Sequence, residues 1–198
     1  MQNKENALLK HYNESGTLPE REAELDALIA RSVSLVKEND EESASALAFL
    51  CRAAKREKQK NEIIGEFSDR ASLYAALSSD SPKKRKNVAR LLGAFESECD
   101  SDALLSALDC ESSRMVRPSL LLAVGNCGGE AARAYLSTYR VLPPKDESEK
   151  KHFREEEQAL KTALDKLLPR ENAVFTEPET PVLAELRAPV GLSRALCA

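Results

Sequence analysis

The sequence is poor in aromatic residues. It contains no tryptophan, and phenylalanine and tyrosine supply only 5% of its 198 residues. Strands favour aromatic and β-branched side chains, whereas the abundant Ala, Leu, Glu, Lys and Arg are good helix formers. With 42% hydrophobic and 31% charged residues, the composition suits a folded domain. An all-β protein is therefore excluded, and a helical one is expected.

Long hydrophobic runs are also missing. The longest purely apolar run, residues 120–124, is far too short to cross a bilayer. Residues 1–10 are polar and charged and lack the apolar core of a signal peptide. The formal charge of −4 gives no general attraction to nucleic acid or to an anionic membrane. We expect a cytoplasmic protein with no membrane partner, in which contact with nucleic acid requires a local basic patch.

Residues that hold metals or carry out catalysis are few and scattered. The five cysteines form no CxxC pair, and neither His11 nor His152 has a second ligand at helical spacing. Cys51 and Cys127 occupy apolar helix positions, which indicates reduced thiols in the core. The glutamates at 155–157 lie at a predicted helix start, where negative charge suits the helix dipole. We expect no catalytic residue, metal, cofactor or small-molecule site.

Residues 73–136 contain two similar copies of one helical hairpin. Arg85 is repeated 32 residues later as Arg117, and Gly93 is repeated as Gly125. The apolar positions that recur at the same distance are Val88, Ala89, Leu91, Leu92 and Phe95, matched by Leu120, Leu121, Ala123, Val124 and Cys127. A period of this length predicts a stack of helix pairs.

Upstream of this hairpin the pattern predicts further helices. One covers residues 3–12, and a second follows a capping box at residues 17–20 and runs to about residue 38. Asn39 and Asp40 are suited to cap a third. The charged residues 52–62 are either the end of that third helix or a solvated connection.

Downstream, a polar connection precedes a last helix at about residues 155–168. Its inward positions are expected to be Leu160, Leu164 and Leu167, which repeat the spacing of the preceding hairpin. The sequence pattern then changes. Residues 171–198 contain prolines and a short segment in which apolar and polar residues alternate, but they show no helical periodicity. We expect a helical domain over residues 1–170, followed by a linker and the possible start of a truncated second domain.

Residues 80–93 and 116–125 resemble HEAT repeats. The shared features are Asp80 and Pro82 between paired helices, an Arg early in the second helix and a Gly near its end. The resemblance implies an all-α, right-handed superhelix of three to four helix pairs that binds partners rather than catalysing a reaction. Asp165 stands where the repeat predicts a glycine, which suggests that the last pair is a terminal repeat.

Residues 182–198 bear a second resemblance, to the opening strand and helix of THUMP-containing RNA methyltransferases. The residues that carry it are Leu183, Leu186, Gly191, Leu192 and Leu196. This resemblance implies an accessory domain of an S-adenosylmethionine-dependent RNA methyltransferase whose catalytic domain lies beyond residue 198. No methyl-donor site is assigned, because no Gly-rich loop joins a strand to a helix.

One group of basic residues is a candidate contact for a partner or for nucleic acid. The candidate contact residues are Lys83, Lys84, Lys86, Arg90 and Arg114. In the alternative interpretation the lysines are solvated, and Arg85 and Arg117 bond carboxylates or carbonyls between repeats. A second basic run at residues 52–60 is expected to be an exposed helix face. A protein partner is favoured and an RNA partner is possible.

Overall fold

The computed structural model describes residues 22–53 and 57–167. These residues form nine α-helices and one short 3-10 helix, and they contain no β-strand. Contacts divide the chain into residues 1–168 and residues 169–198, and all described residues belong to the first unit. The prediction of an all-α protein is confirmed for these residues.

Some predictions fall on residues that are not described. They concern the helix at residues 3–12, the capping box at 17–20 and the tail from residue 171 onwards. Within the described ranges, none of the helices combines the length and the hydrophobicity needed to cross a membrane.

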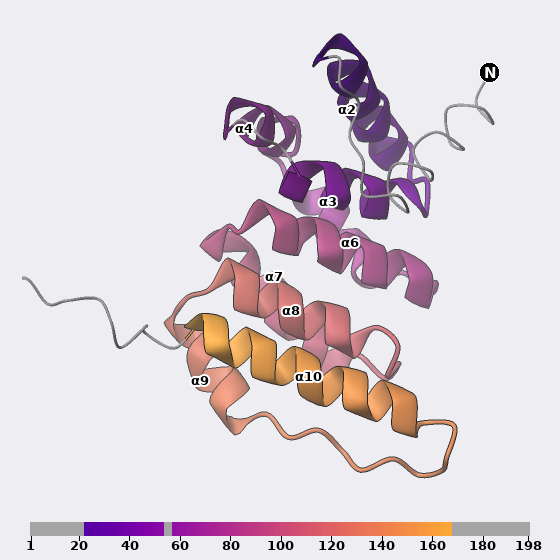
Figure 1. The fold of residues 1–198 in the computed structure, drawn as a ribbon, viewed down its shortest axis with the longest axis vertical. Coiled ribbons are helices and arrows are strands. Elements are labelled where there is room, and N and C mark those ends of the chain that lie inside the picture. The colour runs from indigo at the N-terminus through magenta and orange to yellow at the C-terminus, as the bar shows by residue number, and fades with distance from the viewer. Residues whose placement is uncertain (1–21, 54–56, 168–198) are drawn as a thin grey trace, which may run out of the picture. The chain divides into compact units, whose positions relative to one another are not determined.

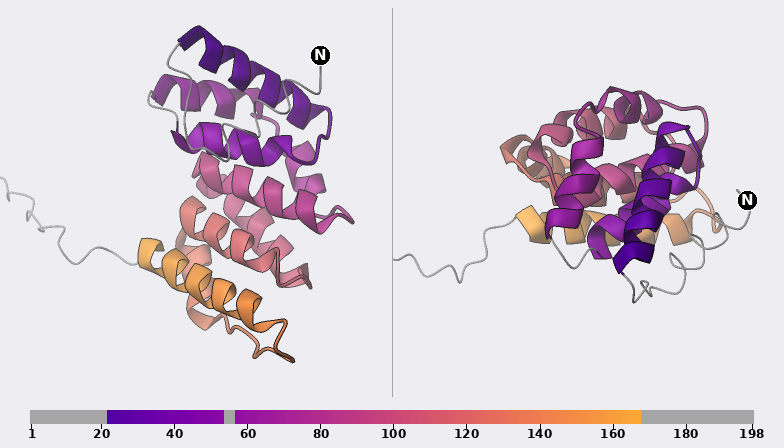
Figure 2. Two further views of the ribbon diagram at one scale, coloured as in Figure 1. Left: turned by 45° about the vertical axis from the view of Figure 1, so that its right-hand side comes forward. Right: turned by 90° about the horizontal axis from the view of Figure 1, so that it is seen from above.

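The helices of the first unit are arranged in two layers (Figures 1 and 2). One layer follows the order α3, α6, α8, α10, in which each helix packs against the next. Behind it, α5 packs on α6, α7 packs on α8, and α9 packs on α7, α8 and α10, while α2 packs on α3 and α4. Their bounds are α2 Glu22–Lys37, α3 Ser43–Ala53, α4 Glu57–Glu66, α5 Ala71–Ala76, α6 Pro82–Phe95, η1 Glu98–Asp100, α7 Ser101–Cys110, α8 Arg117–Cys127, α9 Glu130–Thr138 and α10 Lys150–Leu167.

Helix α6 shows how local sequence starts an element. The Ser81 hydroxyl accepts a hydrogen bond from the Lys84 amide, and Pro82 occupies a first-turn position where no amide is needed. The helix ends at Phe95, and the next residue, Glu96, adopts a left-handed conformation with φ 54°. Helix α6 contains all of the repeated positions from Arg85 to Phe95, as a helix pair requires.

The expectation for residues 52–62 was right only in part. Arg52 and Ala53 end α3, but residues 57–62 belong to a separate helix, α4, which begins at Glu57. From Gln59 onwards, where burial is described, only Gln59 and Ile63 of this helix are buried, so its sequence carries little periodicity. Phe67, just beyond α4, lies 6.0 Å from Phe95 between ring centroids and joins α4 to the main core.

The inward face predicted for the last helix is confirmed at Leu167, which is buried, and was wrong at Leu160 and Leu164. The helix begins at Lys150, five residues early, and Leu160 and Leu164 are only half-buried. Within the described residues no further helix pair covers these two leucines. The residues buried on α10 are Glu156, Ala159, Ala163 and Leu167.

Two glycines explain why α6, α8 and α10 pack so closely. A Cβ on Gly93 would lie 2.8 Å from the Cα of Ala123, and a Cβ on Gly125 would lie 2.6 Å from the Cα of Ala163. Both distances are too short for nonbonded carbon atoms, so a side chain at either glycine would force the neighbouring helix to move. The repeated glycine therefore marks the crossing point between successive helices of one layer.

Candidate partner-binding groove

Arg85 and Arg117 are bound into the helix stack. Arg85 donates from Nε and Nη2 to the two carboxylate oxygens of Glu111, each at 2.8 Å, and from Nη1 to the Ser79 carbonyl at 2.7 Å. Arg117 donates to the Glu111 carbonyl at 2.9 Å, and its Nη1 lies 3.7 Å from Oε1 of Glu156. Both arginines thus connect successive helix pairs and are not available to a partner.

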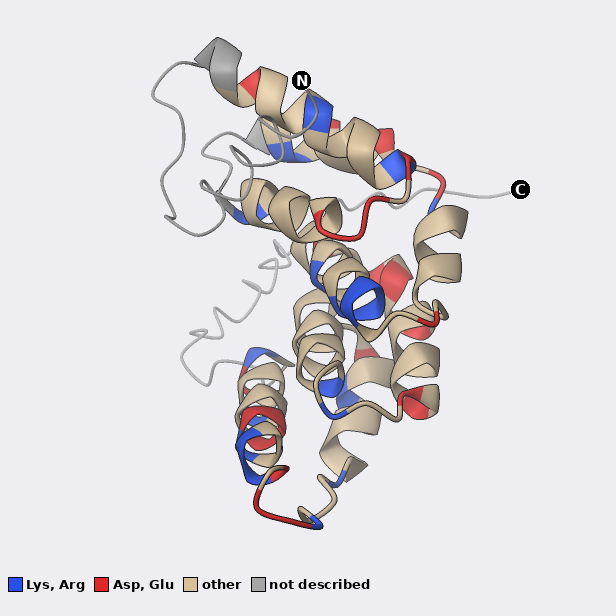
Figure 3. Cartoon of the chain, turned by 90° about the vertical axis from the view of Figure 1, so that its right-hand side faces the viewer, with Lys and Arg blue, Asp and Glu red and all other residues tan. Residues whose placement is uncertain are grey.

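Lys83 and Lys84 are also engaged within the protein. Lys83 pairs with Glu42 at 2.5 Å, and the Lys84 ammonium donates to Oδ1 of Asn39 at 3.2 Å. Figure 3 shows the basic start of α6 next to the acidic turn that joins α2 to α3. Their positive charge is therefore partly matched by the preceding helix pair.

Arg114 lies apart from the other candidates. It donates to the carbonyls of Leu142 and Pro143 at 3.0 and 2.9 Å, and its Nε lies 3.3 Å from Oε2 of Glu149. These bonds attach the long connection before α10 to the start of α8. The structure therefore does not bring the five candidate contact residues together.

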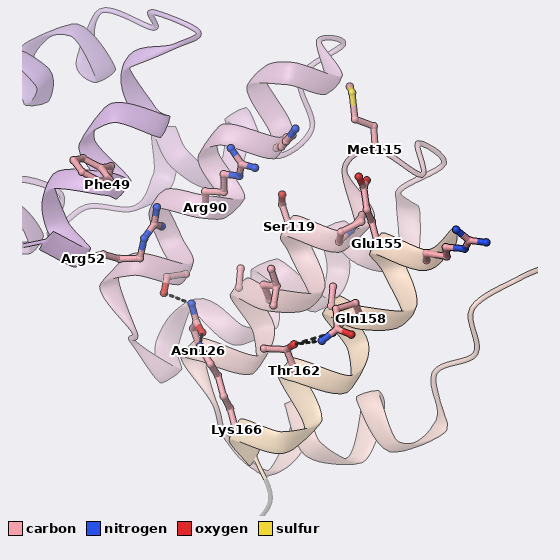
Figure 4. Close-up of a pocket in the computed structure, with 17 residues that line it drawn as sticks. Phe49, Arg52, Arg90, Met115, Ser119, Asn126, Glu155, Gln158, Thr162 and Lys166 are labelled. Carbon is pink, nitrogen blue, oxygen red and sulfur yellow. Dashed lines mark hydrogen bonds between the residues drawn. The ribbon is translucent and has the colours of Figure 1, made fainter. Parts of the chain in front are cut away.

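Lys86 and Arg90 instead face a groove that runs along α8 (Figure 4). The exposed side of α8 forms the floor, α6 and the end of α3 form one wall, and α10 forms the other wall. The groove encloses about 890 Å³. The floor residues are Pro118, Ser119, Leu122, Ala123 and Asn126.

The groove is basic although the chain is acidic. Among the described residues, five basic side chains and one acidic side chain line it. Four of the five form no ion pair with any residue in the part of the chain that the structure describes, and the fifth, Lys166, donates a hydrogen bond to Asn126. The four unpaired residues are Arg52, Lys86, Arg90 and Arg154, hereafter the groove cations.

The single acid in the groove, Glu155, is occupied by neighbours on α10. Its Oε2 lies 3.1 Å from Nδ1 of His152, and its Oε1 lies 3.9 Å from the Lys151 ammonium. Its charge also acts on Lys86, but it offsets only one of the five positive charges that line the groove.

The pKa values of Lys86 and Arg90 are lowered first by burial and only then by neighbouring positive charge. Partial burial and then the charge of Arg90 lower the pKa of Lys86 below its ordinary 10.5. Loss of solvent and then the charge of Arg52 lower the pKa of Arg90. An anion placed in the groove would favour the protonated form of both side chains.

The lining of the groove offers positive charge and apolar surface to a ligand. No group of His, Cys, Asp and Glu side chains that could hold a metal ion occurs among the described residues. Glu156 is fully buried and accepts from the Tyr139 hydroxyl at 2.7 Å, so it lies beneath α10 rather than in the groove. Cations without partners, placed around half-buried apolar residues, are suited to hold an anionic ligand.

Sequence reasoning found two of the groove cations and missed the contribution of α10. Arg154 and Lys166 lie at opposite ends of a stripe with Gln158 and Thr162, in which each residue follows the last by four. On α6, Lys86 and Arg90 have the same spacing of four. This shared spacing of polar residues on two helices of one layer is the sequence signal from which the site could have been predicted.

Comparison with known proteins gives no match. No protein-family model, no curated protein and no solved structure is significantly similar to this chain. The resemblances to HEAT repeats and to THUMP-containing methyltransferases stay predictions, and the groove is characterised by its own geometry.

Proposed function

We propose that the protein is a non-catalytic binding module of the cytoplasm, built of HEAT-like helix pairs in a right-handed superhelix. In this proposal its groove holds a protein partner that presents negative charge. The observation that carries the proposal is the set of groove cations, which are unpaired in the described residues while other basic side chains, such as Arg85 and Lys83, are paired.

The arrangement of the helices supports this role. Stacked helix pairs bury their apolar sides against each other and leave one side of a whole layer free for recognition. Here that layer supplies residues from α3, α6, α8 and α10 to one groove. A partner lying along it would contact segments separated by more than a hundred residues in the chain, from Phe49 to Lys166.

Affinity capture from a nuclease-treated lysate of the source cells tests the proposal. The baits are the wild-type chain, the double variant Arg52→Glu with Arg90→Glu, and the control Arg133→Glu, which changes an exposed arginine of α9 outside the groove. We expect proteins that are retained by the wild type and the control to be lost from the double variant. Equal retention by all three baits would show that the groove is not the binding surface.

The positive groove also favours a second candidate function, an accessory domain of an RNA methyltransferase. This candidate predicts that RNA rather than protein is lost from the double variant when nuclease is left out. It also predicts that the endogenous polypeptide has an intact mass well above 21.8 kDa, which mass spectrometry can measure.

A further inference from the structure

The groove combines two kinds of surface that call for a specific ligand. Along its length lie apolar side chains that remain accessible: Leu122 and Pro118 are half-buried, and Met115 is 40% exposed. The groove cations lie around these residues on α3, α6 and α10. A ligand that fills both surfaces must be apolar on one side and negatively charged on its flanks.

The dimensions of the groove match a short helix. Arg154 and Lys166 are 12 residues apart on α10, which corresponds to about 18 Å at about 1.5 Å per residue. Neighbouring helix axes lie about 8–10 Å apart, so α6 and α10, on either side of α8, are separated by about 16–20 Å. A ligand helix lying over α8 would therefore be within reach of side chains from both α6 and α10.

The lining favours a polypeptide over single-stranded RNA. Phe49 is the one aromatic ring among the described residues that line the groove. Single-stranded nucleic acid is bound largely by stacking bases on aromatic side chains, which this lining cannot provide along its length. Carboxylates of a peptide can instead form bidentate pairs with Arg52, Arg90 and Arg154.

We propose that the groove binds an acidic amphipathic helix of about three turns, with its apolar side against Leu122 and Met115 and its carboxylates against the groove cations. This inference rests on the proposed function and specifies the chemistry of the partner. A helix of this length has little stability in water by itself, so the partner segment folds as it binds.

Fluorescence anisotropy with synthetic ligands tests the inference on the full chain. The probe is a peptide of about 14 residues with leucines at i, i+3, i+4 and i+7 and glutamates at its flanks. A scrambled peptide of the same composition and a single-stranded oligonucleotide of equal charge serve as comparisons. We expect the amphipathic peptide to bind at least about tenfold more tightly than either comparison ligand.

Variants of the chain locate the two contacts. Arg90→Glu and Leu122→Glu are each expected to weaken binding of the amphipathic peptide by about tenfold or more, whereas Arg133→Glu changes it less than about twofold. Circular dichroism confirms that each variant is folded. A photoreactive leucine analogue in the wild-type complex supplies an independent readout and should crosslink to Met115 or to the floor of the groove.

The outcomes separate this inference from the proposed function. Equal affinity for the ordered and scrambled peptides, with loss in Arg90→Glu, would overturn the amphipathic helix and leave an anion-binding groove. Tighter binding of the oligonucleotide would overturn it in favour of RNA. If Arg90→Glu behaves like Arg133→Glu, both proposals fail.

Discussion

Glu111 is the residue at which two helix pairs are joined. Its side chain is 2% exposed and accepts both Arg85 bonds, while its backbone carbonyl accepts from Arg117. Burial by itself would raise the pKa of Glu111, but hydrogen bonds from Arg85 and the Ser113 amide, with the charges of Arg85 and Arg117, hold it below its ordinary 4.5. The carboxylate of Glu111 therefore stays ionised to a lower pH than that of an ordinary glutamate.

Replacing Glu111 by Ala should lower the free energy of unfolding by about 3 kcal/mol, because Arg85 would lose its buried partner. Urea denaturation measures this, with Glu157→Ala on the exposed side of α10 as a control expected to change stability by less than about 0.5 kcal/mol. Since the folded state lowers the pKa, the Glu111 contribution is present above about pH 4.5 and is lost as the pH falls further. A wild-type advantage that stays constant down to low pH would contradict this account.

Thiol chemistry offers a second test at the scale of single residues. Burial raises the pKa of Cys51 to about 11 and that of Cys127 to about 12, whereas Cys99 and Cys110 are exposed. Iodoacetamide at pH 8 should therefore modify Cys99 and Cys110 about a hundredfold faster, because the buried thiols form very little thiolate. Peptide mass spectrometry at several times gives the rates, and comparable labelling of Cys51 would show that α3 is not packed as described.

Among the elements, the crossings of α6 with α8 and of α8 with α10 depend on glycine. Gly93→Ala should destabilise the protein by about 1–3 kcal/mol, since the added methyl group pushes against the backbone of α8. Gly65→Ala in α4 is the matched control, because its Cβ would meet nothing within 4 Å. It should be neutral or stabilising by about 0.5 kcal/mol through helix propensity. Thermal unfolding compares the two, and an equal response would contradict the crossing model.

The elements also show what the sequence could predict. α6 and α8 were predicted well, because both helices lie between neighbouring helices and bury apolar residues such as Leu91 and Leu121. Their apolar pattern is therefore strong in the sequence. α4 was missed because its burial rests on Gln59 and Ile63 among charged residues. The face of α10 was misjudged because contact with Gly125 demands a small residue, Ala163, where hydrophobicity alone favours the adjacent leucine.

The site was less predictable than the fold. The local sequence marks Lys83 and Lys86 as equal members of one basic run, yet the first pairs with Glu42 and the second faces the groove. Which lysine has an acidic partner depends on a turn about 40 residues away in the chain. A local sequence pattern cannot show which of the lysines lies near that turn. Arg154 and Lys166 join the site only because α10 packs beside α8.

At the scale of the whole molecule, the net charge of −4 repels an acidic partner, whereas the basic groove attracts it. An acidic ligand is repelled by the net charge of the chain and attracted by the groove cations, so association should be steered to the groove. The association rate of the acidic peptide should fall by about tenfold or more between about 0.1 M and 1 M NaCl, where the screening length drops from about 10 to 3 Å. Stopped-flow fluorescence measures the rate, and a salt-independent value would argue against electrostatic steering.

The central position of helix α8 affects the order in which the helices unfold. It packs against α6, α7, α9 and α10, and both glycine crossings include it, whereas α4 packs on α2 and α3 at the periphery. When helix pairs are stacked in a row, they open one after another from the ends of the stack. The amides of α8 are then released only when its neighbours on both sides have separated. Hydrogen exchange should therefore be slowest in α8 and fastest in α4. The floor of the groove would then be the last part of the described chain to lose its structure, so its contact residues stay in place while the outer helices fluctuate.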